Sequence, residues 1–210
     1  MLFTHMIRTA LLLGVFALIS TWLVAITFDA TKEPIAVSEK KALLRNLHQL
    51  IPPIIHDNDL FTDVITVKDP YYLGSDNPMR VFRARENSRP TALAIEAVAP
   101  DGYSGNIFLL LAIRYDGTLL GVRVSKHKET PGLGDAIEIE RSAWITDFDN
   151  RSLSTTDSHA WQVEKDGGDF DQFTGATITP RAIVKAVHKT LQYYQQHRDS
   201  LYADSNKQEN

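Results

Sequence analysis

Residues 107–127 read IFLLLAIRYDGTLLGVRVSKH, and this stretch predicts the antiparallel sheet around which the chain is organised. Two apolar runs flank Asp116-Gly117, the residue pair typical of a two-residue β-hairpin turn. Within the second run, Val122 and Val124 alternate with polar residues, as expected of a strand with one solvated face. We therefore expect two paired strands here.

Outward from this hairpin, short apolar runs separated by turn-rich stretches continue toward the N-terminus, and an amphipathic helix follows on the C-terminal side. The strands we expect are Val64–Val67, Met79–Arg85, Thr91–Ala99, Ile107–Tyr115 and Thr118–His127. Ala182–His197 has apolar residues at three- and four-residue spacing and predicts the helix. The combination predicts an α+β domain.

The N-terminal part of the chain predicts a membrane anchor. Thr9–Phe28 is 20 residues without a formal charge, bounded by Arg8 and Asp29. A helix of that length spans about 30 Å, the thickness of a hydrocarbon core. A cleaved signal peptide is the alternative, but its apolar core is shorter and ends in a small-x-small cleavage site. The basic residue before the span favours a cytoplasmic N-terminus and an extracytoplasmic domain.

These observations divide the chain into five expected parts. They are a short cytoplasmic N-terminus (1–8), a transmembrane anchor (9–28), a connector and helix (29–57), an extracytoplasmic domain (58–197) and a flexible tail (198–210). In the connector, Asp29–Pro34 predicts a polar hinge. Ser38 is expected to cap a second helix that reaches about Leu50 and is ended by Pro52-Pro53.

Composition excludes several functional classes. The 26 acidic residues outnumber the 22 basic ones, so we expect no nucleic-acid partner, which would need a concentrated basic face. The chain has no cysteine, which excludes disulfides, thiol nucleophiles and cysteine-ligated metals. The 7 histidines form neither an HExxH motif nor an i, i+4 pair, so no metal site is expected. Redox chemistry would therefore need a bound organic cofactor or a metal held by nitrogen and oxygen ligands.

The first candidate site segment is DFDQFTGATITP, residues 169–180. Thr179 and Pro180 are expected to be the N-cap and first residue of the final helix. Thr177 would then lie just before a helix N-terminus, where free backbone N–H groups favour an anion such as phosphate. A plain turn and helix cap, with no ligand, is the alternative.

The second candidate segment is KHKETPGLGD, residues 126–135. Its proline and glycines predict a loop whose backbone can approach a planar ligand, with Leu133 as an apolar contact. Lys126, His127 and Lys128 are placed to lend positive charge to a reduced, anionic ligand ring. A surface turn with solvated charges is the alternative.

DQFTGAT resembles the Asp-x-x-Ser/Thr-Gly-Ala-Thr signature of the FMN-binding domain family, with Asp171 as its first residue. PDGYSG (100–105), KETPGLGD (128–135) and DGGDFDQFTGATITP (166–180), in this order behind an anchor, are similar to the G subunits of Rnf/Rsx-type ion-translocating electron-transport complexes. The resemblance implies FMN linked covalently through its phosphate to Thr177. The residues it implies around the cofactor are Thr174, Gly175, Ala176, Glu129, Thr130, Gly132, Leu133 and Gly134, with no catalytic residue.

The resemblance also implies a function. The chain would be a flavin-carrying electron-relay subunit, not an autonomous enzyme, of a complex coupling ferredoxin/NAD electron transfer to ion translocation. It would be a single-pass protein of the bacterial inner membrane with its flavin domain in the periplasm. Its partners would be the other membrane and peripheral subunits, a flavin transferase, and lipid around the anchor. Two alternatives remain: the C subunit of sodium-translocating NADH:quinone reductase, and an anchored structural subunit that carries no flavin.

Overall fold

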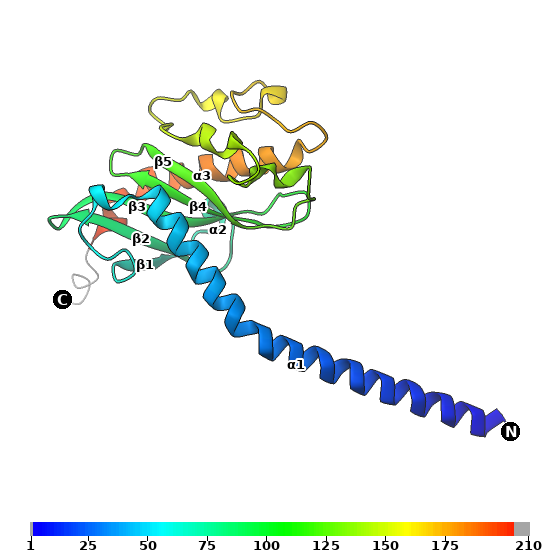
Figure 1. The fold of residues 1–210 in the computed structure, drawn as a ribbon. Helices are drawn as coiled ribbons and strands as arrows, with labels where there is room; N and C mark the ends of the chain where they lie inside the picture. The colour runs from blue at the N-terminus through cyan, green and yellow to red at the C-terminus, as the bar shows by residue number, and fades with distance from the viewer. Residues whose placement is uncertain (1, 204–210) are drawn as a thin grey trace. The chain divides into compact units, whose positions relative to one another are not determined.

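The computed structural model describes residues 2–203, and the chain forms two units, residues 1–44 and 45–210 (Figure 1). Helix α1 (Leu2–Leu50) forms the first unit as far as Leu44, and its C-terminal residues from Arg45 belong to the second unit. In the described part of the chain it is the one helix long and apolar enough to cross a membrane, and an 18-residue stretch of it has a mean hydropathy of 2.3. Its large apolar side chains, such as Phe16 and Trp22, are exposed, as lipid contact requires.

Helix α1 corrects the expected hinge. The helix runs without interruption through Asp29–Pro34, and no separate helix starts at Ser38. Pro34 removes only one backbone hydrogen bond, and good helix formers such as lysine, glutamate and alanine surround it. The Thr31 hydroxyl also donates to the Thr27 carbonyl, 2.7 Å away, within the same helix. The predicted end near Leu50, before two prolines, agrees with the structure.

The second unit is built on a five-stranded antiparallel sheet, which confirms the predicted fold class (Figure 1). The strands follow one another in the order β1 (Val64–Val67), β2 (Met79–Glu86), β3 (Arg89–Ala99), β4 (Ile107–Arg114) and β5 (Leu119–Lys126). The predicted turn joins β4 to β5: the Asp116 carboxylate accepts the Thr118 N–H at 2.9 Å, and Gly117 has a φ of 94°. Neighbouring strands in the sequence are thus neighbours in the sheet.

Helix α3 (Ile178–Tyr202) packs against β3 and supplies much of the core. Its buried face includes Ile183, Val187 and Leu191, which belong to one apolar cluster with the sheet. The helix is longer at both ends than the predicted Ala182–His197. Residues 198–202 are therefore helical and not part of a tail, while the rest of the expected tail, from residue 204, lies outside the described residues.

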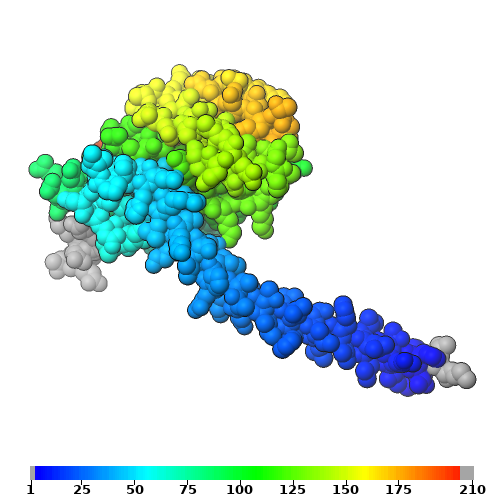
Figure 2. Space-filling view, viewed as in Figure 1, coloured from blue at the N-terminus to red at the C-terminus, as the bar shows by residue number. Residues whose placement is uncertain are grey.

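Short helices fill the connections. They are η1 (Pro53–Ile55), α2 (Pro70–Leu73), η2 (Gly134–Ile137), η3 (Ala143–Phe148), η4 (Ser158–Ala160) and η5 (Glu164–Asp166). The segment from η2 to the start of α3 passes over the second unit as one layer, yellow-green to orange in Figure 2. Trp144 and Phe148 of η3 are buried beneath it. This layer leads the chain from β5 to the N-terminus of α3.

The last turn of α1, which belongs to the second unit, packs on β5. Leu47 and Ile51 are fully buried, and Leu50 lies over Gly121. A Cβ at Gly121 would be 2.8 Å from Leu50 Cδ2, so a glycine is needed for this close approach.

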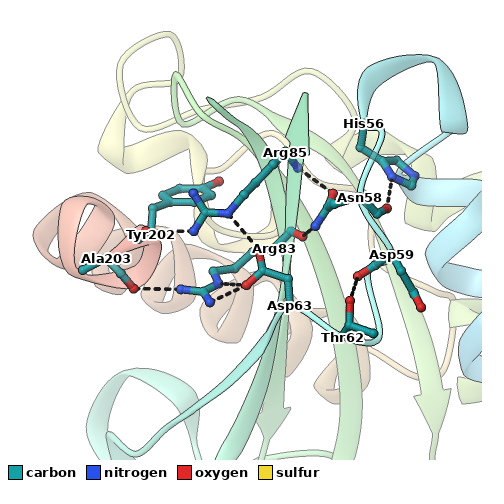
Figure 3. A network of polar contacts seen from close by, with 9 residues as sticks. All are labelled: His56, Asn58, Asp59, Thr62, Asp63, Arg83, Arg85, Tyr202 and Ala203. Carbon is teal, nitrogen blue, oxygen red and sulfur yellow. Dashed lines mark hydrogen bonds and ion pairs between the residues drawn. The ribbon is translucent and has the colours of Figure 1, made fainter. Parts of the chain in front are cut away.

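An ionic cluster fixes the C-terminal end of α3 to the sheet (Figure 3). Asp63, just before β1, accepts from Nε of Arg83 at 2.5 Å and from Nε of Arg85 at 2.7 Å. The two β2 guanidinium groups also donate to main-chain carbonyls at the helix end, Ala203 at 2.8 Å and Tyr202 at 2.9 Å. Cations at a helix C-terminus complement its dipole, so this cluster explains why α3 extends beyond its predicted end.

We expect Asp63→Asn to lower the free energy of unfolding by about 3 kcal/mol, because two largely buried guanidinium groups would lose their shared anion. The matched control is Asp101→Asn, which breaks the exposed ion pair with Lys185 and should cost less than about 1 kcal/mol. The measurement is urea unfolding of the full chain in detergent, followed by tryptophan fluorescence. Equal losses in the two variants would contradict the prediction.

Candidate functional site

A pocket of about 330 Å³ lies at the N-terminal end of α3. Three segments that are distant in the sequence line it: the loop after β3, the loop after β5, and the chain entering α3. The lining residues are Tyr103, Glu129, Thr130, Leu133, Gly134, Gly175, Ala176, Thr177, Ile178 and Thr179. The fold thus brings the three motifs of the sequence to one place.

The pocket contains seven of the nine predicted site residues; the other two are nearby but do not line it. Thr174 lies in the exposed turn between Phe173 and Ala176, which form an isolated antiparallel bridge. The N–H of Gly132 donates to Asp135 Oδ1 at 2.7 Å, so this glycine shapes the loop after β5.

Sequence reasoning missed three lining residues, Tyr103, Ile178 and Thr179. Tyr103 is in PDGYSG, so the motif itself was the signal that could have placed it in the site. Thr179 was interpreted only as a helix cap.

The chain that leads to Thr177 is held by backbone and aromatic contacts. Gly168 lies close against the backbone of Gln162, and a Cβ at Gly168 would be only 2.0 Å from the Gln162 carbonyl oxygen. Further along, the indole N–H of Trp144 donates to the Asp171 carbonyl at 2.8 Å, and the Trp144 ring meets that of Phe173 edge-to-face at 5.2 Å. These contacts fix the DQFTGAT segment to the core before it turns into α3.

The start of α3 corrects the predicted cap. Thr177 itself occupies the N-cap position, and its side chain makes no capping hydrogen bond. Thr179 lies in the first turn of the helix, where its hydroxyl donates to Glu129 Oε2 at 2.6 Å. Pro180 is tolerated next to it, because first-turn residues need no intrahelical N–H donor. The Thr177 hydroxyl is therefore not used to cap the helix.

Glu129 is the polar centre of the pocket wall. It is 5% exposed and accepts from the Thr179 hydroxyl and, at 3.0 Å, from the Ser104 N–H. Gly134 packs against it: a Cβ there would be 3.0 Å from both Glu129 Cβ and Oε2. One carboxylate therefore joins the three segments that form the pocket.

His127 supports the same loop from outside the pocket. The Glu129 N–H donates to His127 Nδ1 at 3.0 Å, and His127 Nε2 lies 2.8 Å from Glu138 Oε1. Since a backbone N–H can only donate, Nδ1 is the acceptor and Nε2 carries the proton given to Glu138. The expected supply of positive charge to the ligand is not found: Lys126, His127 and Lys128 do not line the pocket.

The lining residues suit a planar aromatic ligand bound beside Thr177. Tyr103, Leu133 and Ile178 offer apolar surface that is 68%, 47% and 46% exposed. Gly175, with a φ of 82°, leaves the approach to the Thr177 hydroxyl open, since a Cβ there would touch only Leu133 Cδ2, 3.8 Å away. An isoalloxazine ring fits this combination of apolar contacts and a nearby hydroxyl.

Comparison with known proteins identifies both parts of the chain. Residues 1–50 match the RnfG N-terminal region, and residues 102–192, which include every pocket residue, match the FMN-binding domain. Three similar proteins are each named as the G subunit of an ion-translocating oxidoreductase complex. The one from Shewanella oneidensis is 48% identical over 94% of this chain and 93% of its own length. The one from Shewanella amazonensis is 52% identical over 88% of this chain and 86% of its own length. The one from Vibrio cholerae is 48% identical over 95% of this chain and 95% of its own length. The chain therefore belongs to the family of G subunits of ion-translocating oxidoreductase complexes.

Proposed function

We propose that this chain is an electron-relay subunit that carries FMN as an ester between the flavin phosphate and Thr177. The complex it serves would couple electron transfer between ferredoxin and a nicotinamide nucleotide to ion translocation. The single observation that carries the proposal is the Thr177 hydroxyl, which lies in the pocket at the start of α3 and is not used as a cap.

Three threonines line the pocket, and the contacts favour Thr177 among them. The hydroxyl of Thr179 is engaged with the buried Glu129 carboxylate. Thr130 belongs to the loop after β5, whereas Thr177 lies at the start of α3, where free backbone N–H groups favour a phosphate. Thr177 follows two residues without bulky side chains, so a modifying enzyme can reach its hydroxyl.

The covalent step is a phosphoryl transfer carried out by a flavin transferase. The Thr177 oxygen forms a bond to the flavin phosphorus, the anhydride bond of an activated flavin nucleotide breaks, and the hydroxyl proton leaves with the departing phosphate. FMN, once attached, supplies the electron-transfer chemistry. The chain's own residues position the ring.

We further propose that helix α1 anchors the chain as a single pass in the bacterial inner membrane, with the flavin domain in the periplasm. The length and hydropathy of the helix support a membrane span, and Arg8 before the apolar stretch supports a cytoplasmic N-terminus. Its partners would be the other subunits of the complex, the flavin transferase and the surrounding lipid.

Thr177→Ala should abolish covalent flavin, because no other oxygen at that position can form the ester. The full chain is co-produced with an active flavin transferase, and flavin fluorescence is read on a denaturing gel together with the intact mass. Thr177→Ser should retain flavin. Thr62→Ala, which removes an exposed threonine hydroxyl outside the pocket, is the matched control and should remain labelled. A wild-type chain that carries no flavin under these conditions would contradict the proposal and favour the alternative of a structural subunit without flavin.

The absence of native cysteine allows a clean test of orientation. A single Asp76→Cys substitution, at an exposed loop position of the second unit, should react with a membrane-impermeant maleimide in cells with a permeabilised outer membrane. Thr4→Cys, at the other end of the apolar stretch, should react only after the inner membrane is opened. The reverse pattern of labelling would place the flavin domain in the cytoplasm.

A further inference from the structure

The pocket has a negatively charged wall, which is unusual for a site that binds a phosphate group. Of the ten residues that line it, only Glu129 is charged, and its charge is negative. Protein sites for free phosphates ordinarily use arginine, lysine or the N-terminus of a helix to hold the anion. Here the lining includes no arginine or lysine, which leaves the N-terminus of α3 as the available source of positive potential.

A carboxylate of the chain itself lies beside that helix N-terminus. The Glu129 carboxylate accepts from the Thr179 hydroxyl in the first turn of α3 and from the Ser104 N–H. Burial of Glu129, together with its contact with Gly134, fixes the carboxylate in place. The helix dipole stabilises this charge as it would stabilise a bound phosphate.

The nearest cations on α3 are engaged away from the pocket. Arg181 makes two hydrogen bonds to Asp166, at 2.6 and 2.8 Å, and these lower the pKa of the Asp166 carboxyl. Lys185 is 2.5 Å from Asp101. Neither residue lines the pocket, so neither offsets the Glu129 charge at its surface.

We propose that Glu129, the charged residue of the pocket wall, places a negative charge beside the start of α3 and thereby disfavours the binding of free FMN and other phosphate anions. The inference deepens the proposed function and rests on it: the ester at Thr177, and not a phosphate-binding site, retains the flavin. A free FMN phosphate carries between about −1.5 and −2 at neutral pH, because its second pKa is near 6. A phosphodiester carries a single negative charge, so esterification also reduces the repulsion from Glu129.

The test compares two flavins on the full chain, purified in detergent from cells without flavin transferase. FMN and riboflavin share the isoalloxazine ring and differ in the phosphate, so the ratio of their dissociation constants measures the effect of the phosphate alone. Glu129→Gln removes the charge and retains an oxygen that accepts from Thr179. The matched control is Glu140→Gln, which removes one negative charge from an exposed residue outside the pocket.

Glu129→Gln should bind FMN at least about tenfold more tightly than the wild type, as expected for removing a like charge a few ångströms away in a partly buried site. Its affinity for riboflavin should change much less, and Glu140→Gln should match the wild type for both ligands. The proposal is wrong if Glu129→Gln gains no affinity for FMN, including the case in which neither protein binds it.

Wild-type protein provides a second measurement if circular dichroism shows that Glu129→Gln does not fold. Salt screens repulsion, so the affinity of the wild type for FMN relative to riboflavin should rise between low and high ionic strength. A fall with salt, or tighter binding of FMN than of riboflavin at low salt, would overturn the proposal. Both assays use the chain without attached flavin. They can therefore contradict the role of Glu129 even if Thr177 is shown to carry flavin, and they can support that role even if it does not.

Discussion

The pocket depends on one buried interaction, the hydrogen bond between the Thr179 hydroxyl and the Glu129 carboxylate. These residues are 50 positions apart, and the same carboxylate also accepts the Ser104 N–H from a third segment. A buried carboxylate without donors would be strongly unfavourable, so the three segments must close together for the charge to be tolerated. Gly134 follows from this arrangement, because any larger residue would meet the carboxylate.

Helix α3 is held at its two ends by charges of opposite sign. A carboxylate lies at its N-terminus, while the guanidinium groups of Arg83 and Arg85 bind the carbonyls at its C-terminus. Both arrangements complement the helix dipole, and the apolar face between them packs on the sheet. Thr177 therefore lies at the end of an element whose position is fixed along its whole length.

Local patterns predicted the sheet and the motifs, and long-range contacts determined the rest. Alternating side chains and the Asp116-Gly117 turn give the hairpin, because both depend on neighbouring residues. The same local reasoning predicted a hinge before Pro34, where the helix in fact continues. It also interpreted Thr179 as a cap, since nothing near it in the sequence indicates a partner 50 residues away. The C-terminal end of α3 was misplaced because Asp63 and its two arginines become neighbours of that helix terminus only in the folded chain.

The Glu129 interaction also allows the pocket to form without a bound cofactor. Its hydrogen-bond donors are supplied by the chain itself, so the pocket wall is complete before any cofactor arrives. A site that used cations to hold a free phosphate would leave those cations buried and unpaired in the unloaded protein, at a cost of several kcal/mol. In this chain a carboxylate lies beside the helix start, and the proposed ester at Thr177 would retain the flavin without such cations. The pocket is then free to contact the ring through uncharged surfaces such as those of Tyr103, Leu133 and Ile178.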